Sequence, residues 1–257
     1  MINNEIKVIL LVAGEGKRLR PYTLDRPKCM VEVNGISLVD RQLNVLKKEG
    51  IRNIVMVGGD RSDSLNYKDI KLKLNTRYYE TNMVWSLFCA EDELKGDVIV
   101  SYGDIVYSGE ILKSLLQSTS DIAVVIDKNW ESYWSLRNDN PLDDAETLKL
   151  RNDGTISEIG QKPKSLSEID GQYMGLIKLS SYGVEQLKHI FHSSVKKGSL
   201  LGKKIETAYM TDLLQAIIQS GERVTAVPTY SEWVEVDTVK DLKLEVTTER
   251  LDKIHHE

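Results

Sequence analysis

The chain has 257 residues, which allows one large α/β domain or two small ones. Its formal net charge of −5 argues against a nucleic-acid-binding protein, so a small anionic substrate would require locally placed cations. No apolar run approaches the roughly 20 residues that span a bilayer. The two cysteines show neither metal-ligand nor redox spacing, and we expect buried free thiols in a cytoplasmic protein without a membrane partner.

Strands and helices alternate through the first half of the sequence. A nearly continuous apolar run at Lys7–Val12 predicts a strand buried on both faces. A helix is predicted from about Leu38 to Glu49, with Gly50 as its stop. Further strands are predicted at Asn53–Gly58, Leu74–Tyr78, Asp97–Tyr102 and Ile122–Ile126, and further helices at Asn82–Leu94 and Ser108–Ser118. This alternation predicts an α/β fold with a Rossmann-like, doubly wound, mixed but mostly parallel sheet flanked by helices.

The composition changes at about Asn129, after which Asp, Asn, Ser and Trp are frequent up to residue 167. We expect short strands at Thr147–Arg151 and Ile156–Gly160, and a helix at Met210–Gln219 capped by Thr207 or Thr211. The other predicted elements are strands at Gly175–Leu179, Arg223–Val227 and Glu235–Val236, a helix at Tyr182–His192, and one final helix from Val239 to about Lys253.

The most specific motif follows the first strand directly. It reads LVAGEGKRLRP from Leu11 onward, and PKCM comes shortly after it. Gly14 and Gly16 let the backbone N–H groups approach phosphate oxygens, while Arg18 and Lys28 can neutralise a polyphosphate. The spacing is neither a Walker motif nor a dinucleotide fingerprint, and Gly-x-Gly alone would indicate only a tight turn.

These residues together resemble the signature of the nucleotidyltransferases that make sugar nucleotides and CDP-alcohols. Tyr102-Gly-Asp104 resembles the metal-binding Gly-Asp of that family, and Glu235-Val-Asp237 resembles the segment with its second metal carboxylate. The resemblance extends over essentially the whole chain. It implies a Mg²⁺-dependent enzyme with the nucleotide-diphospho-sugar transferase fold, which joins a nucleotidyl group to a phosphorylated acceptor and releases pyrophosphate.

The resemblance also implies roles for individual residues. Arg18 and Lys28 are the expected catalytic residues, because nucleotidyl transfer depends on positioning and charge neutralisation. Asp104 and Asp237 are the expected Mg²⁺ ligands, although Asp104 could instead cap a strand end and Asp237 could cap the last helix. The expected nucleotide contacts are Leu11, Ala13, Gly14, Glu15, Gly16, Lys17, Arg18, Asn82, Ser86 and Tyr102.

The region around Asn82 bears on the substrates. Residues 78–87 lack the Gln-Pro-x-Gly segment of hexose-1-phosphate enzymes and resemble the Asn-x-x-x-Ser-Leu helix start of the cytidylyltransferases that act on phosphocholine, 2-aminoethylphosphonate or phosphoglutamine. The resemblance therefore favours CTP and a small phosphorylated amine or amino acid, with L-glutamine phosphate favoured and CDP-L-glutamine as product. Lys162 is a candidate ligand of the acceptor phosphate and can equally be a solvated loop lysine. The expected acceptor contacts are Lys28, Asn82, Lys162, Tyr173, Gly175 and Glu235.

The tryptophan-rich segment Asn129–Asp144 is either a lid that recognises an amine or amino acid, or a solvent-exposed insertion. We expect a single domain, as a monomer or homodimer, in which residues 1–128 bind the nucleotide, 129–238 bind the acceptor and 239–257 form a C-terminal helix. A hexose-1-phosphate uridylyl- or thymidylyltransferase is the first alternative. The second is a catalytically inactive nucleotide-binding regulatory subunit, which would not need both Asp104 and Asp237.

Overall fold

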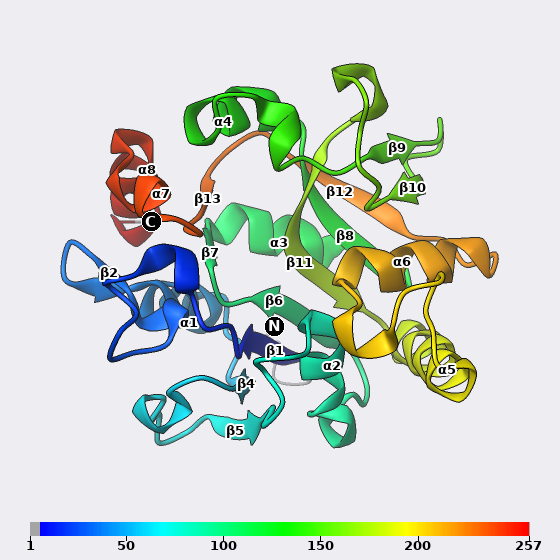
Figure 1. The fold of residues 1–257 in the computed structure, drawn as a ribbon, viewed down its shortest axis with the longest axis horizontal. Coiled ribbons are helices and arrows are strands. Elements are labelled where there is room, and N and C mark those ends of the chain that lie inside the picture. Colours follow the sequence, from blue (N-terminus) through cyan, green and yellow to red (C-terminus); the bar gives the residue numbers. More distant parts are fainter. Residues whose placement is uncertain (1–5, 257) are drawn as a thin grey trace.

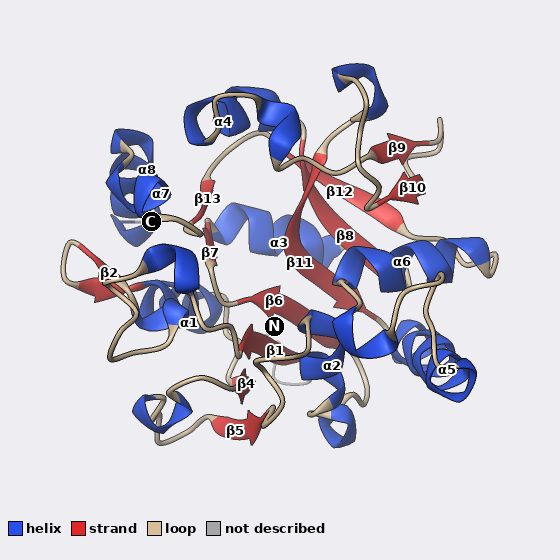
Figure 2. Cartoon of the chain, viewed as in Figure 1, coloured by secondary structure: helices blue, strands red, loops and turns tan. Residues whose placement is uncertain are grey.

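A seven-stranded sheet runs through the centre of the structure, a computed structural model that describes residues 6–256 (Figures 1 and 2). The strand order is β12-β8-β11-β6-β1-β4-β5. Only β11 lies antiparallel to its two sheet neighbours; the other described pairs in this sheet are parallel, which confirms the expected mixed, mostly parallel sheet. Its strands are β1 (Lys7–Val12), β4 (Asn53–Gly58), β5 (Lys71–Leu74), β6 (Val98–Tyr102), β8 (Ile122–Asp127), β11 (Gln172–Leu179) and β12 (Thr225–Thr229).

Helices cover both faces of this sheet because its strands are apolar on both sides. Side chains of β1 alternate: Val8 and Leu10 pack with α1 and α3, whereas Ile9 and Leu11 pack with α2, α5 and α6. The helices are α1 (Leu38–Lys48), α2 (Met83–Phe88), α3 (Gly109–Gln117), α4 (Trp130–Arg137), α5 (Ser181–Lys197), α6 (Met210–Gln219), α7 (Val239–Lys243) and α8 (Glu245–His256). Within the described residues, no helix has the length and apolarity needed to cross a membrane.

Three two-stranded ribbons lie outside the main sheet. The first joins β2 (Glu32–Val33) to β3 (Ile36–Ser37), and the second joins β9 (Leu148–Leu150) to β10 (Ile156–Ile159). The third pairs β7 (Ile105–Tyr107) with β13 (Trp233–Glu235) in antiparallel register. This last ribbon matters for the site, because it brings residues after β13 next to the loop that follows β6.

Two elements near the middle of the first half differ from their predictions. The strand expected at Leu74–Tyr78 is β5, which ends at Leu74, because the buried Asn75 side chain accepts from the Arg77 N–H and turns the chain. The helix expected at Asn82–Leu94 ends at Phe88, and a separate 3₁₀ turn follows at Glu91–Glu93. Ala90 leaves helical geometry between the two, with φ −112° and ψ 30°.

Two further predictions are wrong in the second half. The single helix expected at 239–257 is two helices separated by Leu244, whose extended backbone ends α7; residue 257 lies outside the described residues. Neither Thr207 nor Thr211 caps α6, because Tyr209 occupies the N-cap position and Asp212 accepts from its backbone N–H at 2.9 Å.

The segment expected to be a lid or an exposed insertion contains α4, whose Trp130, Tyr133, Trp134 and Arg137 are buried.

Candidate active site

The first cavity lies where β1 and β6 end side by side. Leu11 and Tyr102 are register partners on these parallel strands, so the loops after both strands meet at one edge of the sheet. A Cβ atom on Gly103 would lie 2.5 Å from Val12 Cγ1, so only glycine allows this close approach. The cavity has a volume of about 300 Å³ and is lined by Leu11, Val12, Gly14, Glu15, Gly16, Lys17, Arg18, Lys28, Cys29, Met83, Tyr102, Gly103, Asp104 and Asp237.

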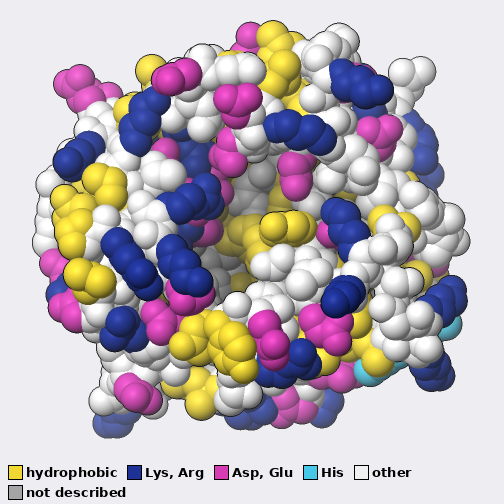
Figure 3. All heavy atoms as spheres, in the orientation of Figure 1, with side chains coloured by type: hydrophobic (Ala, Val, Ile, Leu, Met, Phe, Trp, Pro, Cys, Tyr) yellow, Lys and Arg dark blue, Asp and Glu magenta, His cyan; other side chains and the backbone are white. Residues whose placement is uncertain are grey.

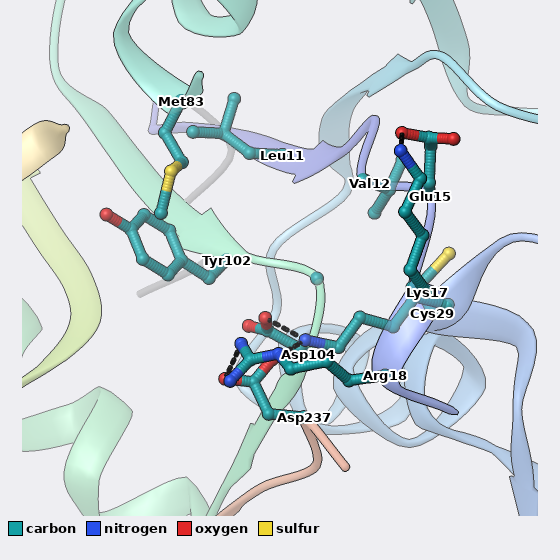
Figure 4. A pocket seen from close by; sticks show the side chains of 14 residues that line it. Leu11, Val12, Glu15, Lys17, Arg18, Cys29, Met83, Tyr102, Asp104 and Asp237 are labelled. Carbon is teal, nitrogen blue, oxygen red and sulfur yellow. Dashed lines mark hydrogen bonds and ion pairs between the residues drawn. The ribbon is translucent and has the colours of Figure 1, made fainter. Parts of the chain in front are cut away.

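The glycine-rich turn brings its cations to this cavity through a left-handed residue. Gly16 has φ +61°, and a Cβ atom there would lie 2.9 Å from Thr23 and 3.0 Å from Lys28. Thr23 Oγ1 donates to the Gly16 carbonyl at 2.8 Å, which closes the turn. Lys17 pairs with Glu15 at 2.6 Å. Figure 4 shows this pair at the upper right, away from Asp237 near the lower centre. The backbone around this turn therefore directs Arg18 and Lys28, rather than Lys17, at Asp104 and Asp237.

Lys28 and Arg18 converge on Asp104 and Asp237, the two carboxylates predicted to bind metal. Figure 4 shows Arg18 beside these two carboxylates. Lys28 Nζ lies 2.6 Å from Asp104 Oδ2 and also contacts Asp237 Oδ1, while Arg18 Nη2 lies 2.9 Å from Asp237 Oδ2. Burial alone would lower the pKa of Lys28, but the charges of Asp104 and Asp237 outweigh it and hold that pKa above its usual value. Burial likewise opposes ionisation of Asp237, yet Lys28 and Arg18 hold its pKa below the usual value.

Three carboxylates could share one cation here. Asp104, Glu235 and Asp237 each place one oxygen within 4.8 Å of the others. Asp104 Oδ1 is buried and has no hydrogen-bond partner among the described residues, so it keeps a free ligand position. Lys28 Nζ already provides a positive charge between two of these groups. This set of hard oxygen donors, with a stand-in cation, fits a divalent metal ion.

The capping alternatives for these carboxylates find no support in the contacts. Thr238, not Asp237, is the N-cap of α7, and it forms a reciprocal capping box with Asp241. The carboxylate of Asp104 contacts Lys28, whereas its backbone carbonyl accepts from the Val236 N–H at 3.0 Å. Both side chains are therefore directed into the cavity.

A second cavity of about 190 Å³ adjoins the first. The two share Met83, Tyr102 and Asp237 in their walls. The other lining residues of the second cavity are Trp134, Asp144, Glu146, Gln172, Tyr173, Tyr209, Thr211 and Glu235. Figure 3 shows this face of the molecule hollowed near its centre, with Lys and Arg side chains on its left and Asp and Glu side chains above.

Glu235 lies in the wall of the second cavity and has an unusual ionisation. Burial raises its pKa to about 7, although the neighbouring Arg137 guanidinium opposes this shift. Arg137 and Glu235 form an ion pair. Tyr173 also lines this cavity, and its buried hydroxyl has no hydrogen-bond partner in the described part of the chain.

Gly175 lines neither cavity, but its lack of a side chain leaves room for the Tyr102 ring. It has φ +84°, and a Cβ atom there would lie 2.6 Å from the Tyr102 ring. Glycine thus allows that ring to lie over β11, where the Tyr102 and Tyr173 rings pack edge to face with their centres 5.7 Å apart. Tyr102 then forms part of the wall between the two cavities.

Four other predicted residues line neither cavity. Asn82 Nδ2 donates to the Thr207 carbonyl at 2.8 Å, and Ser86 Oγ accepts from the buried Asn75 at 2.9 Å. Lys162 Nζ binds the carbonyls of Leu142 and Asp143, and Ala13 is buried. The first three side chains hold neighbouring segments together, so their direct substrate contacts stay predictions.

Sequence reasoning missed most of the second cavity. Asp144 ends the segment that was expected either to recognise an amine or to be exposed to solvent, and Glu146 lies just outside that segment. Gln172 was missed too, because its role is local: its side chain hydrogen-bonds the backbone N–H and C=O of Glu146. No sequence signal distinguished Met83, Tyr209 or Thr211 as lining residues.

A mostly parallel sheet with Arg18, Lys28, Asp104 and Asp237 gathered in a cavity at its strand ends is the arrangement expected of a nucleotidyltransferase. The chain belongs to the family of MobA-like NTP transferase domains, which it matches over residues 8–162. It is 39% identical to a CTP:phosphoglutamine cytidylyltransferase of Campylobacter jejuni, over 94% of this chain and 99% of that protein.

Other relatives agree with this assignment. A choline-phosphate cytidylyltransferase of Streptococcus pneumoniae is 30% identical, over 44% of this chain and 52% of that protein. The inositol-1-phosphate CTP transferase from T. maritima has the same fold, with a TM-score of 0.77, 21% identity, and coverage of 98% of this chain and 96% of that chain. The expected fold and the expected resemblance to cytidylyltransferases are confirmed.

Proposed function

We propose that the protein transfers CMP from CTP to a small phosphorylated amino acid, with L-glutamine phosphate as the favoured acceptor. Its products are then CDP-L-glutamine and pyrophosphate. The similarity to the C. jejuni enzyme over nearly the full length of both chains supports this acceptor. The observation in the structure that carries the proposal is the second cavity, which adjoins the cation-lined cavity at Asp237 and has carboxylates in its wall.

The walls of the second cavity suit an acceptor with an ammonium group. Asp144 and Glu146 form no ion pair with another described residue, and the one hydrogen bond described for the Glu146 carboxylate is a 3.4 Å contact from Thr211. Burial raises the pKa of Glu146, a cost that a bound ammonium group would offset. The rings of Trp134, Tyr173 and Tyr209 add aromatic surface.

The proposed reaction fits the arrangement of the two cavities, which adjoin at Asp237. An oxygen of the acceptor phosphate attacks the α-phosphorus of CTP, a new P–O bond forms, and the bond to the β-phosphate oxygen breaks as pyrophosphate leaves. Arg18 and Lys28 lie where they can neutralise the charge that develops on the phosphates. Mg²⁺ held by Asp104 and Asp237, with Glu235 nearby, would supply further positive charge to the phosphate oxygens.

The same arrangement supports a division of labour along the chain. The first cavity is lined by residues from Leu11 to Asp104 and by Asp237, whereas most residues of the second lie between Trp134 and Glu235. We therefore propose that residues 1–128 bind the nucleotide and 129–238 bind the acceptor.

Pyrophosphate release tests this proposal directly. The protein is incubated with Mg²⁺, each of CTP, UTP, dTTP and ATP, and one of L-glutamine phosphate, phosphocholine, 2-aminoethylphosphonate or glucose 1-phosphate. We expect release with CTP and L-glutamine phosphate and none after Asp104→Asn. Preference for phosphocholine would contradict the amino-acid acceptor, turnover of glucose 1-phosphate with UTP or dTTP would contradict the cytidylyl assignment, and binding of CTP without turnover would identify a regulatory subunit.

A further inference from the structure

Arg137 connects the aromatic helix α4 to the carboxylates of the site. It is the last residue of α4, and its side chain is 3% exposed. Its Nε donates to Asp241 Oδ1 at 2.9 Å, and Nη1 pairs with Glu235. The guanidinium lies 5.5 Å from the centre of the Tyr133 ring and 5.1 Å from that of Trp134, so the rings fix its plane.

Asp241 passes this constraint on to Asp237. Its Oδ2 accepts from the backbone N–H of Asp237 at 3.0 Å, and from the N–H and hydroxyl of Thr238 at 2.8 and 3.0 Å. The Asp241 side chain is 2% exposed, so its charge has little solvent to stabilise it. Arg137 supplies the balancing charge, mainly through the short contact to Oδ1, with a longer contact of 3.5 Å from Nη2 to the Oδ2 that holds the peptide carrying Asp237.

We propose that Arg137 is the positioning residue for the metal carboxylates, an inference that rests on the proposed function. It orients Glu235 through a direct ion pair and Asp237 through Asp241. The planar guanidinium presents its donors to Glu235 and Asp241 at a fixed angle, whereas a lysine ammonium on its flexible stem can pair with carboxylates but does not fix the angle between them. Because Trp134 of the same helix lines the second cavity, α4 also joins the acceptor wall to the metal carboxylates.

Arg250 offers a matched control. It lies over the same Tyr133 ring, 4.4 Å from the ring centre, and donates to the Trp233 carbonyl at 2.9 Å. The hydrogen bond described for it goes to a backbone oxygen and not to Glu235 or Asp241. Arg137→Lys and Arg250→Lys therefore make the same chemical change in one cluster, but only the first removes a contact to the site carboxylates.

Metal binding without turnover distinguishes positioning from simple support of the fold. Mn²⁺ is titrated into the full chain without nucleotide, and free Mn²⁺ is read by electron paramagnetic resonance; melting temperature, kcat and KM are then measured with Mg²⁺, CTP and acceptor. For Arg137→Lys we expect Mn²⁺ affinity and kcat to fall by about 10- to 100-fold, as for other groups that orient metal ligands. For Arg250→Lys we expect Mn²⁺ affinity and kcat to stay near wild type. We expect the melting temperatures of the two variants to fall by similar amounts.

Several outcomes decide the proposal. Equal Mn²⁺ affinity and equal kcat in the two variants would overturn it. If Arg137→Lys does not fold, Asp241→Asn takes its place, because asparagine keeps an acceptor for the backbone N–H groups and loses the charge paired with Arg137. Near-normal Mn²⁺ affinity in Asp241→Asn would then overturn the link to Asp237. If wild type binds Mn²⁺ but transfers CMP to no acceptor, the proposed function fails, while the comparison of metal affinities still tests Arg137.

Discussion

At the level of single residues, Lys28 lies where the two halves of the site meet. Its ammonium contacts Asp104, which follows β6, and Asp237, which follows β13. These carboxylates would repel each other without it, because they are close together and largely shielded from solvent. The Lys28 ammonium thus stabilises the folded chain and also takes part in the proposed chemistry.

Replacing Lys28 should separate these two roles. Lys28→Gln is expected to lower kcat by about 10²- to 10³-fold, as for loss of other groups that stabilise transition-state charge. It should also increase the rise in melting temperature that Mg²⁺ produces, because the ion can then balance both carboxylates. Differential scanning fluorimetry with and without Mg²⁺ checks this. Lys17→Gln, which removes only the pair with Glu15, is the control; an equal Mg²⁺ effect in both variants would contradict the charge-balance argument.

Gly175 gives a second prediction at this scale. Gly175→Ala introduces a Cβ atom at φ +84° that would lie 2.6 Å from the Tyr102 ring, whereas Gly154→Ala has φ +78° with nothing within 4 Å. The left-handed backbone alone should cost each variant about 1–2 kcal/mol of unfolding free energy. Gly175→Ala should lose more unfolding free energy than Gly154→Ala. Its KM for the acceptor should also rise, because Tyr102 must move. Urea denaturation and steady-state kinetics measure both; equal losses in the two variants would show that the ring does not constrain position 175.

Sequence predicts the site unevenly at this scale. Arg18, Lys28, Asp104 and Asp237 could be predicted because their motif states both residue type and spacing. Most of the walls of the second cavity could not be predicted, since they come from segments far apart in the chain and contain ordinary residue types. Arg137 lies in the tryptophan-rich segment Asn129–Asp144, but its role could not be predicted, because its two partners lie about 100 positions away.

At the level of elements, the strongly apolar strands were easiest to predict. β1 and β4 have the predicted bounds, because a continuous apolar run bounded by glycine allows few other structures. The strand at β5 was displaced because it is short, lies at the sheet edge and alternates lysine with leucine. The helix α4 was not predicted at all: its buried residues Trp130, Tyr133, Trp134 and Arg137 do recur at helical spacing, but the helix has only eight residues and one of these four is charged.

The edge strand β5 is joined to β1 through one carboxylate. Glu93 pairs with Lys7 of β1 at 2.8 Å and also with Lys71 of β5. Hydrogen bonds from Lys7 and Lys71 lower the pKa of Glu93 to about 2. The folded chain therefore binds this proton less readily than the unfolded chain, and the pair stabilises the fold above the ordinary pKa of glutamate.

Glu93→Gln should reveal this contribution as a function of pH. At pH 7 we expect it to lower the unfolding free energy by about 1–3 kcal/mol, because two lysines lose a charged acceptor. The difference from wild type should shrink as the pH falls from about 4.5 towards about 2, where Glu93 becomes protonated in the folded chain. Urea denaturation between pH 2 and pH 7 measures it. Glu110→Gln, in an exposed pair with Lys113, should show little dependence; a constant difference for Glu93→Gln would rule out the lowered pKa.

At the level of the whole molecule, the proposed nucleotide and acceptor halves share one sheet. β11 belongs by sequence to the acceptor half, yet it pairs with β6 on one side and β8 on the other, both from the first half. β12 then extends the sheet beyond β8 (Figure 1). The fold class was predictable from the alternation of elements, but the position of β11 was not, because strand order depends on pairings between distant segments.

The central position of β11 has a consequence for how the chain acquires its structure. During synthesis β6 and β8 emerge first, and each lacks a neighbour on its inner side until β11 inserts between them. Until then the chain exposes unpaired strand edges, which favour association with other chains. Completing the sheet also requires contacts between segments distant in sequence, and such contacts form slowly. We therefore expect the first half, expressed alone, to aggregate, and the full chain to refold slowly, with insertion of β11 as the step that commits it to the native state.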